Sequence, residues 1–243
     1  MSISEKLPIL FRDENYIVIH KFSGLLVHSS KEDRFEKRFA LQMLRDQIGS
    51  RVYPLHRLDK STSGALMFAT SSEAARLMGE EFKNGRIEKK YLAIVRGHFL
   101  EKEISVDYQL KQIQDRRSRQ LGNDKPPQEA QTLFRVLSTA ELIEPIHPHP
   151  TARYSLVEAQ PLTGRKHQIR RHLKHLSHPI VGDVNYGVGV HNQLFRTKFD
   201  SHRLLLASTS LKFKDPYSKK EICVKAPLEQ SFQKVIDQLG WTL

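Results

Sequence analysis

Predicted short strands outnumber predicted helices in this chain and follow one another directly. This order of elements constrains the fold more than any other feature of the sequence. Runs of β-branched and aromatic residues predict strands at 16–20, 65–70, 89–96, 132–138, 153–160, 203–213 and 221–225. Helical spacing with start and stop signals predicts helices at 37–48, 72–82, from 166 onward and at 230–239. Strands that succeed each other without a helical crossover pair antiparallel. The sequence therefore predicts the α+β class, with a mainly antiparallel mixed sheet and flanking helices.

The charge balance indicates a polyanionic partner. The 243 residues include 39 Lys and Arg against 27 Asp and Glu, a formal net charge of +12. Such an excess is typical of proteins that meet nucleic acid or an anionic membrane surface. No apolar run approaches the ~20 residues that a spanning helix needs, so we expect no membrane association. We find no internal repeat or low-complexity linker and predict one continuous domain over residues 1–243.

The single cysteine and the first residues bear on the compartment. One cysteine, Cys223, excludes an internal disulfide and is typical of a reducing cytosol. The start of the chain lacks the charged and apolar halves of a signal peptide, so we expect a cytoplasmic protein. Cys223 lies between Ile222 and Val224 in a predicted strand, and we expect it to be a core residue.

Two segments have the composition of loops. Residues 111–130 are polar, charged and rich in Gly and Pro, which predicts an exposed, mobile loop. A solvated hairpin tip and an RNA-contacting finger are equally good interpretations of that loop. Residues 144–150 hold three prolines, which remove backbone N–H groups, so we expect irregular structure there.

Asp59 is the first candidate for chemistry. It stands between Arg57 and Lys60 in a polar turn that ends at Gly64. Neighbouring cations favour an ionised carboxylate, which can act as a nucleophile or a base but not as an acid. A structural ion pair or a turn-forming Asp is the ordinary alternative. The Gly- and Ser-rich turn between strands favours the reactive interpretation, and no second carboxylate is near enough for a glycosidase-like pair.

Residues 163–174 form a wholly basic segment with five Lys or Arg and no acid. Ile169 and Leu173 belong to an apolar stripe that docks the predicted helix on the core. We expect Lys166, Arg170 and Lys174 along one edge of that helix. A solvated face is the common explanation of a charge run, but such faces mix signs. The segment therefore favours a phosphate or carboxylate partner, with the helix N-terminus as a suitable place for it.

The histidines of this region suggest a metal site, which we do not expect. His172, His175 and His178 recur every three residues, and His167 lies one turn earlier. No Asp, Glu or Cys stands among them at ligand spacing, and the Glu of the zinc-peptidase motif is missing. His178 also precedes Pro179, which ends the helix. We predict no metal and no other cofactor.

Four blocks in a fixed order carry a resemblance to a known family. They are Arg-Leu-Asp-x-x-Thr-Ser-Gly at 57–64, Lys-Tyr-Leu-Ala-Ile-Val-Arg-Gly at 90–97, Thr-Gly-Arg-x-His-Gln-Ile-Arg at 163–170, and His-Pro-Ile-Val-Gly-Asp at 178–183 with Tyr-Gly at 186–187. In these blocks the chain resembles the RluA family of pseudouridine synthases. The resemblance implies that family's fold, with an RNA-binding cleft, and cofactor-free isomerisation of uridine to pseudouridine in RNA.

The resemblance also implies roles for individual residues. Asp59 would be the nucleophile, attacking either C1′ of the ribose or C6 of the base. Arg170 would pair with Asp59, and Arg57 would hold the target base out of its helix. Tyr91, which spacing alone would make a core residue, would stack on the uracil and relay a proton. The pocket wall and the phosphate contacts would come from Ile169, Lys21, Arg165, Lys166 and Lys174.

The family's opening motif Asn-Lys-Pro-x-Gly is altered here to His20-Lys21-Phe22-Ser23-Gly24. Loss of the proline predicts a looser turn, and we do not infer lost activity from it. Because the chain begins at this motif, we expect no N-terminal S4 domain. RNA binding must then come from the catalytic domain.

The substrate expected from the resemblance is tRNA, at uridine 65 of the T-stem, because residues 151–183 and the C-terminal segment look most like the branch with that specificity. Ribosomal RNA is the alternative within the family. A catalytically vestigial RNA-binding protein is the alternative from another class, and the intact Asp59, Tyr91 and Arg170 argue against it. We expect a monomer without an obligate protein partner.

Overall fold

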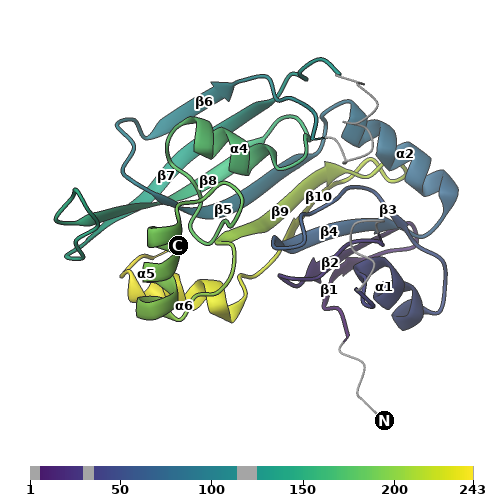
Figure 1. Cartoon of the computed structure of the whole chain (residues 1–243). Coiled ribbons are helices and arrows are strands. Elements are labelled where there is room, and N and C mark those ends of the chain that lie inside the picture. Colours follow the sequence, from purple (N-terminus) through teal and green to yellow (C-terminus); the bar gives the residue numbers. More distant parts are fainter. Residues whose placement is uncertain (1–5, 30–35, 114–124, 243) are drawn as a thin grey trace, which may run out of the picture. The chain divides into compact units, whose positions relative to one another are not determined.

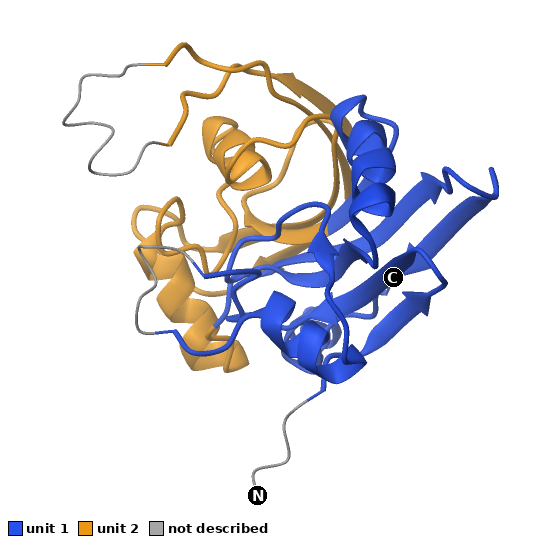
Figure 2. Cartoon of the chain, turned by 90° about the vertical axis from the view of Figure 1, so that its right-hand side faces the viewer, with its two compact units in different colours: residues 1–91, 203–243 blue, residues 92–202 orange. Residues whose placement is uncertain are grey.

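A computed structural model describes residues 6–29, 36–113 and 125–242 of the chain. Its contacts group the residues into two compact units, shown in blue and orange in Figure 2. Unit 1 comprises Met1–Tyr91 and Arg203–Leu243, and unit 2 comprises Leu92–His202. Both units combine strands with helices, and the chain has the predicted α+β class.

Unit 1 is built on a mixed sheet with the strand order β1-β2-β4-β9-β5 (Figure 1). β2 pairs antiparallel with β1 and β4, whereas β4 and β9 pair in parallel. β3 adds to β4 and β10 to β9, both antiparallel. The elements of this unit are β1 (Ile9–Arg12), β2 (Tyr16–Lys21), α1 (Ala40–Ile48), β3 (Tyr53–Pro54), β4 (Ser63–Ala69), α2 (Ser72–Lys83), the start of β5 (Glu88–Arg96), β9 (Leu206–Lys214), β10 (Glu221–Lys225) and α6 (Gln230–Gln238).

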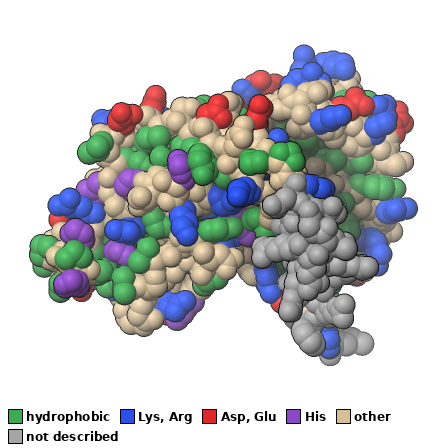
Figure 3. Space-filling model, turned by 45° about the horizontal axis from the view of Figure 1, so that its top comes forward, with side chains coloured by type: hydrophobic (Ala, Val, Ile, Leu, Met, Phe, Trp, Pro, Cys, Tyr) green, Lys and Arg blue, Asp and Glu red, His purple; other side chains and the backbone are tan. Residues whose placement is uncertain are grey.

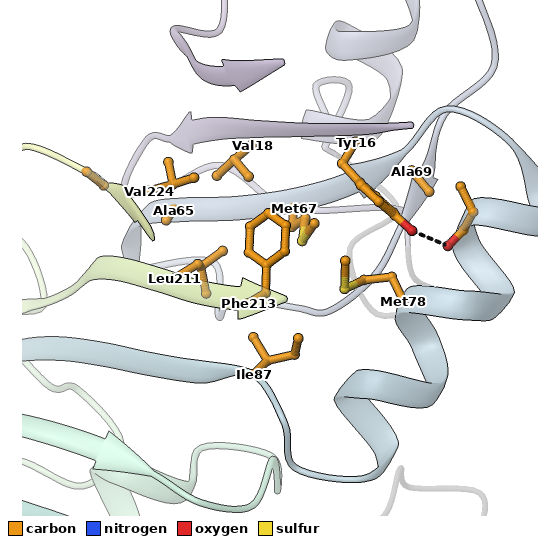
Figure 4. Packing of buried hydrophobic residues seen from close by; sticks show 12 residues of the cluster. Tyr16, Val18, Ala65, Met67, Ala69, Met78, Ile87, Leu211, Phe213 and Val224 are labelled. Atoms are coloured by element: carbon orange, nitrogen blue, oxygen red, sulfur yellow. Dashed lines mark hydrogen bonds between the residues drawn. The ribbon is translucent and has the colours of Figure 1, made fainter. Parts of the chain in front are cut away.

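The core of unit 1 lies between this sheet and α2. Figure 4 shows Phe213 of β9 surrounded by buried side chains from β2, β4, α2 and β10. Tyr16 packs edge-on against Phe213, with 6.4 Å between the ring centroids. The Tyr16 hydroxyl donates to the carbonyl of Ala74 at 3.4 Å, which joins β2 to α2. This packing holds β4, the strand that leaves the Asp59 turn.

Unit 2 has the strand order β5-β8-β7-β6, in which β6 pairs antiparallel with β7. β7 pairs antiparallel along its length with β8, with one register shift between Val136 and Ser138. Helix α4 contacts both of these strands. The elements are the end of β5, β6 (Glu103–Asp107), β7 (Gln131–Leu142), β8 (Ala152–Pro161), α4 (Gln168–His175) and α5 (Gly189–Phe199).

Most predicted elements are confirmed, because their local signals act in the structure as expected. Ser71 caps α2 by accepting from Ala74 N at 3.1 Å, and Gly49 ends α1 with a φ of 74°. The helix predicted from Lys166 begins two residues later, after His167 with a φ of 57°. The strands β1, β3 and β6 and the helix α5 were not predicted, because their segments are short or weakly patterned.

The prediction of a buried cysteine is wrong. Cys223 lies in β10 as predicted, but its side chain is exposed. Successive residues of a strand point to opposite faces. Val224 points into the core, so its neighbour Cys223 points to solvent.

The predicted loop at 111–130 is described only at its ends, and residues 114–124 lie outside the described residues. Leu110 and Gln128 exchange two backbone hydrogen bonds of 2.8 and 3.0 Å, so the described ends of the segment meet. No helix in the described part of the chain is long and apolar enough to cross a membrane.

Candidate active site

The Asp59 turn in unit 1 joins β3 to β4. Its first half closes on itself, because the Asp59 carbonyl accepts from Thr62 N at 3.0 Å. Its end is set by Gly64, which has a φ of 111° and pairs with Ser208 of β9. A Cβ at Gly64 would lie 1.9 Å from the Ser208 carbonyl oxygen. Only glycine therefore lets β4 approach β9 so closely directly after the turn.

Hydrogen bonds from the turn at residues 20–24 hold the Asp59 turn in place. Gly24 N donates to the Lys60 carbonyl at 2.8 Å, and Ser23 Oγ donates to the Ser61 carbonyl at 2.9 Å. Lys21 Nζ donates to the same Lys60 carbonyl at 3.1 Å. Three hydrogen bonds thus fix the segment that lacks the family's proline.

Lys21 is a structural residue and not an exposed phosphate ligand. Its side chain is fully buried, and Nζ also donates to the carbonyls of Phe22 and Leu25, at 2.9 and 2.7 Å. Burial lowers the pKa of Lys21 to about 7, while the charges of Glu229 and Asp59 oppose that shift. Three carbonyl acceptors match the three N–H groups of an ammonium. These contacts contradict the prediction that Lys21 meets substrate directly.

Glu229 ties the same turn to the C-terminal part of unit 1. Its carboxylate accepts from Ser23 N at 2.8 Å and forms an ion pair with Arg203. Arg203 Nη2 donates to Ser63 Oγ, the residue before Gly64, at 2.7 Å. One partly buried ion pair therefore bonds to both turns that frame Asp59. No local sequence pattern indicates this pair, because its members are 26 residues apart.

Tyr91 lies on β5 in unit 1 and is 8% exposed. Burial raises the pKa of Tyr91 well above its usual range, contact with the Ser208 hydroxyl opposes this, and the negative charge of Asp59 adds to it. The charge of Asp59 therefore acts on the Tyr91 hydroxyl within unit 1. Tyr91 is therefore a protonated phenol at neutral pH, able to donate a proton but not to act as a phenolate base.

Arg57 is exposed at the start of the Asp59 turn, where its charge helps to lower the pKa of the partly buried His28. Burial is the larger cause of that shift. Lys60, on the other side of Asp59, forms an exposed ion pair with Glu36. Arg57 is thus the cation of this turn that is placed to meet a ligand from solvent.

In unit 2, α4 carries Arg170 in a buried, two-pronged ion pair with Asp183. Arg170 Nε lies 2.7 Å from Asp183 Oδ2, and Nη2 lies 2.9 Å from Oδ1. Burial alone would raise the pKa of Asp183, but its hydrogen bonds and the charge of Arg170 hold that pKa below its usual value. The ring of Tyr186 lies 5.1 Å from the Arg170 guanidinium carbon. The guanidinium is therefore held in a fixed plane.

Asp183 holds the side chain of Arg170, a role that the sequence did not predict for it. It also accepts from the backbone N of Asn185 and Tyr186, at 2.9 and 3.0 Å. Gly187 is close enough that a Cβ there would lie 2.2 Å from the Asp183 carbonyl oxygen. The block 178–187 is one of the motifs that carry the resemblance. In this structure it holds the Arg170 side chain through Asp183. The predicted pairing of Arg170 with Asp59 joins the two units and stays a prediction.

Gln168 organises the rest of the basic segment. Its Oε1 accepts from Arg165 N and Thr163 Oγ1, at 2.9 and 2.7 Å, and its Nε2 donates to the Gln131 carbonyl at 2.8 Å. Ile169 is buried, at 6% exposure, whereas Lys166 and Lys174 are exposed. Phosphate contacts of these two lysines stay a prediction, whereas Arg170, which was expected along the same edge, is buried against Asp183.

The histidines of unit 2 have structural partners. His172 uses both ring nitrogens, one to Thr132 Oγ1 at 3.0 Å and one to the Tyr108 carbonyl at 3.1 Å. His175 stacks on Tyr108 with 3.8 Å between the ring centroids. His178 Nδ1 donates to the Arg96 carbonyl at 2.8 Å. Within the described residues, no group of three or more His, Cys, Asp or Glu is placed to hold a metal ion.

Comparisons with known proteins cover the whole of this arrangement. The family described as RNA pseudouridylate synthase matches residues 15–175. A tRNA pseudouridine synthase C from Vibrio parahaemolyticus is 45% identical over 237 residues, which cover 97% of this chain and 96% of that protein. A tRNA pseudouridine synthase C from Haemophilus ducreyi is 46% identical over 236 residues, 97% of each chain.

Solved structures of the same kind share the fold. The structure titled Human RNA Pseudouridylate Synthase Domain Containing 1 has a TM-score of 0.70 at 25% identity and covers 100% of this chain and 98% of that chain. Human RNA Pseudouridylate Synthase Domain Containing 4 has a TM-score of 0.72 at 24% identity and covers 97% and 94%. The similarity therefore extends over both units.

Proposed function

Because this chain is an RluA-type member of the RNA pseudouridylate synthase family, we propose that its substrate is tRNA and that it modifies uridine 65 of the T-stem. One observation carries the choice of substrate: relatives named tRNA pseudouridine synthase C match it at about 45% identity over nearly the full length of both proteins. We further propose that residues 1–243 act as one catalytic domain.

The reaction is an isomerisation that needs no external reactant. The N1–C1′ bond of uridine breaks, the uracil turns, and a C5–C1′ bond forms, after which C5 loses its proton and N1 carries one. Asp59 is the proposed nucleophile, and it attacks either C1′ or C6. Its turn is fixed by hydrogen bonds from residues 21–24, which hold the carboxylate in position before substrate arrives.

Tyr91 and Arg170 complete the proposed catalytic group. Tyr91 stacks on the uracil, and its phenol relays the proton that leaves C5. Arg170 is the proposed partner of Asp59, and within unit 2 its guanidinium is held in one plane by Asp183. Ile169 closes the pocket against water, which limits loss of the base by hydrolysis.

Arg57 and the exposed cations of unit 2 serve RNA binding in this proposal. Arg57 holds the flipped base away from its stack, while Arg165, Lys166 and Lys174 contact phosphates. Such contacts release counterions, so binding should weaken steeply with salt.

The test is pseudouridine mapping of tRNA and ribosomal RNA in cells that lack the gene and are complemented with variants. We expect the wild-type chain to restore one T-stem pseudouridine in tRNA and Asp59→Ala to restore none, with tRNA affinity unchanged within a few-fold. Asp46→Ala is the matched control, because Asp46 is an exposed residue of α1 that bonds only to Gln42 and Arg45 in the described residues.

Each other outcome contradicts a defined part of the proposal. Restoration of a ribosomal pseudouridine by the wild-type chain would retain the chemistry and reject tRNA as substrate. Activity in Asp59→Ala would remove Asp59 from the reaction. No pseudouridine from the wild-type chain would favour a protein that binds RNA without modifying it.

A further inference from the structure

Unit 2 contains a cavity that the proposed reaction does not use. It measures about 550 Å³ and is formed by the end of β5, the segment 146–153, His178 and residues 188–191. Small-molecule sites have volumes of roughly 300–1,000 Å³. Two prolines, Pro148 and Pro150, and the side chains of Ile146 and Val190 give it apolar walls. The cavity is therefore large enough for one nucleotide and offers flat, apolar surfaces to its base.

Arg96 places an uncompensated positive charge in this cavity. Its side chain is half-buried, and it has no hydrogen bond or ion pair with any residue that the structure describes. Its charge reaches the neighbouring groups, because it contributes to lowering the pKa of His191 and His178, for which burial is the larger cause. A half-buried guanidinium keeps part of its hydration, and its N–H donors can form charge-assisted hydrogen bonds with an anion.

The nearby carboxylates are already engaged. Glu141, which lines the cavity, lies 3.3 Å from Arg153 and also accepts from Thr151. Glu144 forms an ion pair of 2.5 Å with Lys198. Neither is paired with Arg96, so the cavity keeps a positive potential that favours an anion.

Two histidines of the cavity, His191 and His98, are engaged with neighbouring polar groups. Burial lowers the pKa of His191 to about 4, and its Nδ1 lies 2.7 Å from the Tyr154 hydroxyl. His98 Nε2 lies 3.0 Å from the carbonyl oxygen of Ala140. The histidines thus shape the wall, and Arg96 supplies the charge. A guanidinium matches two oxygens of a phosphate with two N–H donors.

We propose that this cavity binds one nucleotide of the bound RNA, with its phosphate on Arg96 and its base against the proline-rich segment 146–150. The proposal rests on the proposed function, because it takes the RNA substrate as the source of the nucleotide. Figure 3 shows Lys and Arg side chains distributed among hydrophobic and histidine side chains on one face of the molecule, a mixture suited to nucleotides. A free mononucleotide has the same chemistry and must be separated by experiment.

The test compares Arg96→Met with Arg196→Met in the full chain. Arg196 is an exposed residue of α5 outside the cavity, so the two variants change the charge equally. We expect Arg96→Met to weaken tRNA binding about ten-fold and to reduce the salt slope by about one, and Arg196→Met to change affinity less than two-fold. The single-turnover rate at saturating tRNA should stay unchanged in Arg196→Met.

A second variant keeps the test valid if Arg96→Met fails to fold. Val190 lines the cavity and is 56% exposed, so Val190→Trp should fold and fill the space. It should weaken tRNA binding as Arg96→Met does. Wild-type affinity in Val190→Trp or in folded Arg96→Met would overturn the proposal.

Titration with uridine monophosphate distinguishes the two sources of the nucleotide. If the RNA fills the cavity, bound tRNA should block the mononucleotide, and Arg96→Met should abolish its binding to the free protein. Equal mononucleotide binding with and without tRNA would assign the cavity to a free nucleotide and overturn the proposal. Failure of the proposed function looks different, because the wild-type chain itself would then form no pseudouridine.

Discussion

At the scale of single residues, unit 1 separates Asp59, the proposed nucleophile, from the residues that hold its turn in place. Lys21 is buried next to the Asp59 turn, and its ammonium group donates three hydrogen bonds to backbone carbonyls. Tyr91 is almost as deeply buried, but its phenol shares an electrostatic environment with Asp59. Because burial and the charge of Asp59 both favour the neutral phenol, we expect Tyr91 to enter the proposed reaction with its hydroxyl protonated.

Tyr91→Phe tests this assignment, because it keeps the aromatic ring and removes only the hydroxyl. General acid–base catalysis contributes roughly 10²–10⁴-fold, so we expect a rate loss of about that size in single-turnover assays on tRNA. Affinity for tRNA should stay within two-fold, since the stacking surface remains. A wild-type rate in Tyr91→Phe would restrict Tyr91 to stacking on the base.

At the scale of elements, the close approach of β4 and β9 fixes where the Asp59 turn ends. Gly64 and Ser208 are register partners in the parallel pair of these strands. The helices contribute differently: α6 begins after Glu229, whose carboxylate is bonded to the 20–24 turn, and α4 carries Arg170. The end of the Asp59 turn is thus placed by strand pairing, and Arg170 is placed by a helix.

Gly64→Ala should therefore be strongly destabilising. Its new Cβ would meet the Ser208 carbonyl and would also require a non-glycine residue at a φ of 111°. Losses above about 4 kcal/mol mark such backbone conflicts, and we expect urea unfolding to show a loss of that order. Gly79→Ala is the control, because open space surrounds Gly79 in α2 and Ala favours a helix by about 1 kcal/mol. Equal stability of the two variants would contradict the close strand contact.

At the scale of the whole molecule, each unit buries a histidine that must stay neutral. Burial lowers the pKa of His56 in unit 1 to about 3 and that of His191 in unit 2 to about 4. His56 accepts from Met67 N at 3.1 Å, a bond that only the neutral ring can accept. Lowering the pH should therefore destabilise both units.

We expect the free energy of unfolding to fall as the pH is lowered from about 6.5 to 4. In that window the unfolded chain protonates both histidines at their ordinary pKa near 6.5, while the folded chain does not. The stability is fully present above pH 6.5 and is lost toward the lowered pKa values. Urea titrations from pH 8 to 4.5 measure this slope. His202→Gln, at an exposed position, should leave it unchanged, and a flat profile for the wild-type chain would contradict the burial of the two rings.

The sequence by itself determined the features that depend on neighbouring residues. Strand alternation, the Ser71 cap and the Gly49 stop are encoded within a few positions, and β10 was predicted with its observed bounds. The motif at 57–64 also gave the proposed nucleophile Asp59, because one acid in a short polar turn that ends at a glycine is a local pattern.

The tertiary structure decided what depends on contacts between distant segments. Which face of β10 is buried follows from packing against the core, and so Cys223 is exposed. Arg170 finds Asp183 through the loop after α4, and Lys21 finds the Lys60 carbonyl across 39 positions. Such partners are chosen by burial and by the need to satisfy each polar group, which only the folded chain imposes. Contacts between distant segments also form the cavity beside the half-buried Arg96. The position of Arg96 in a predicted strand does not indicate that cavity.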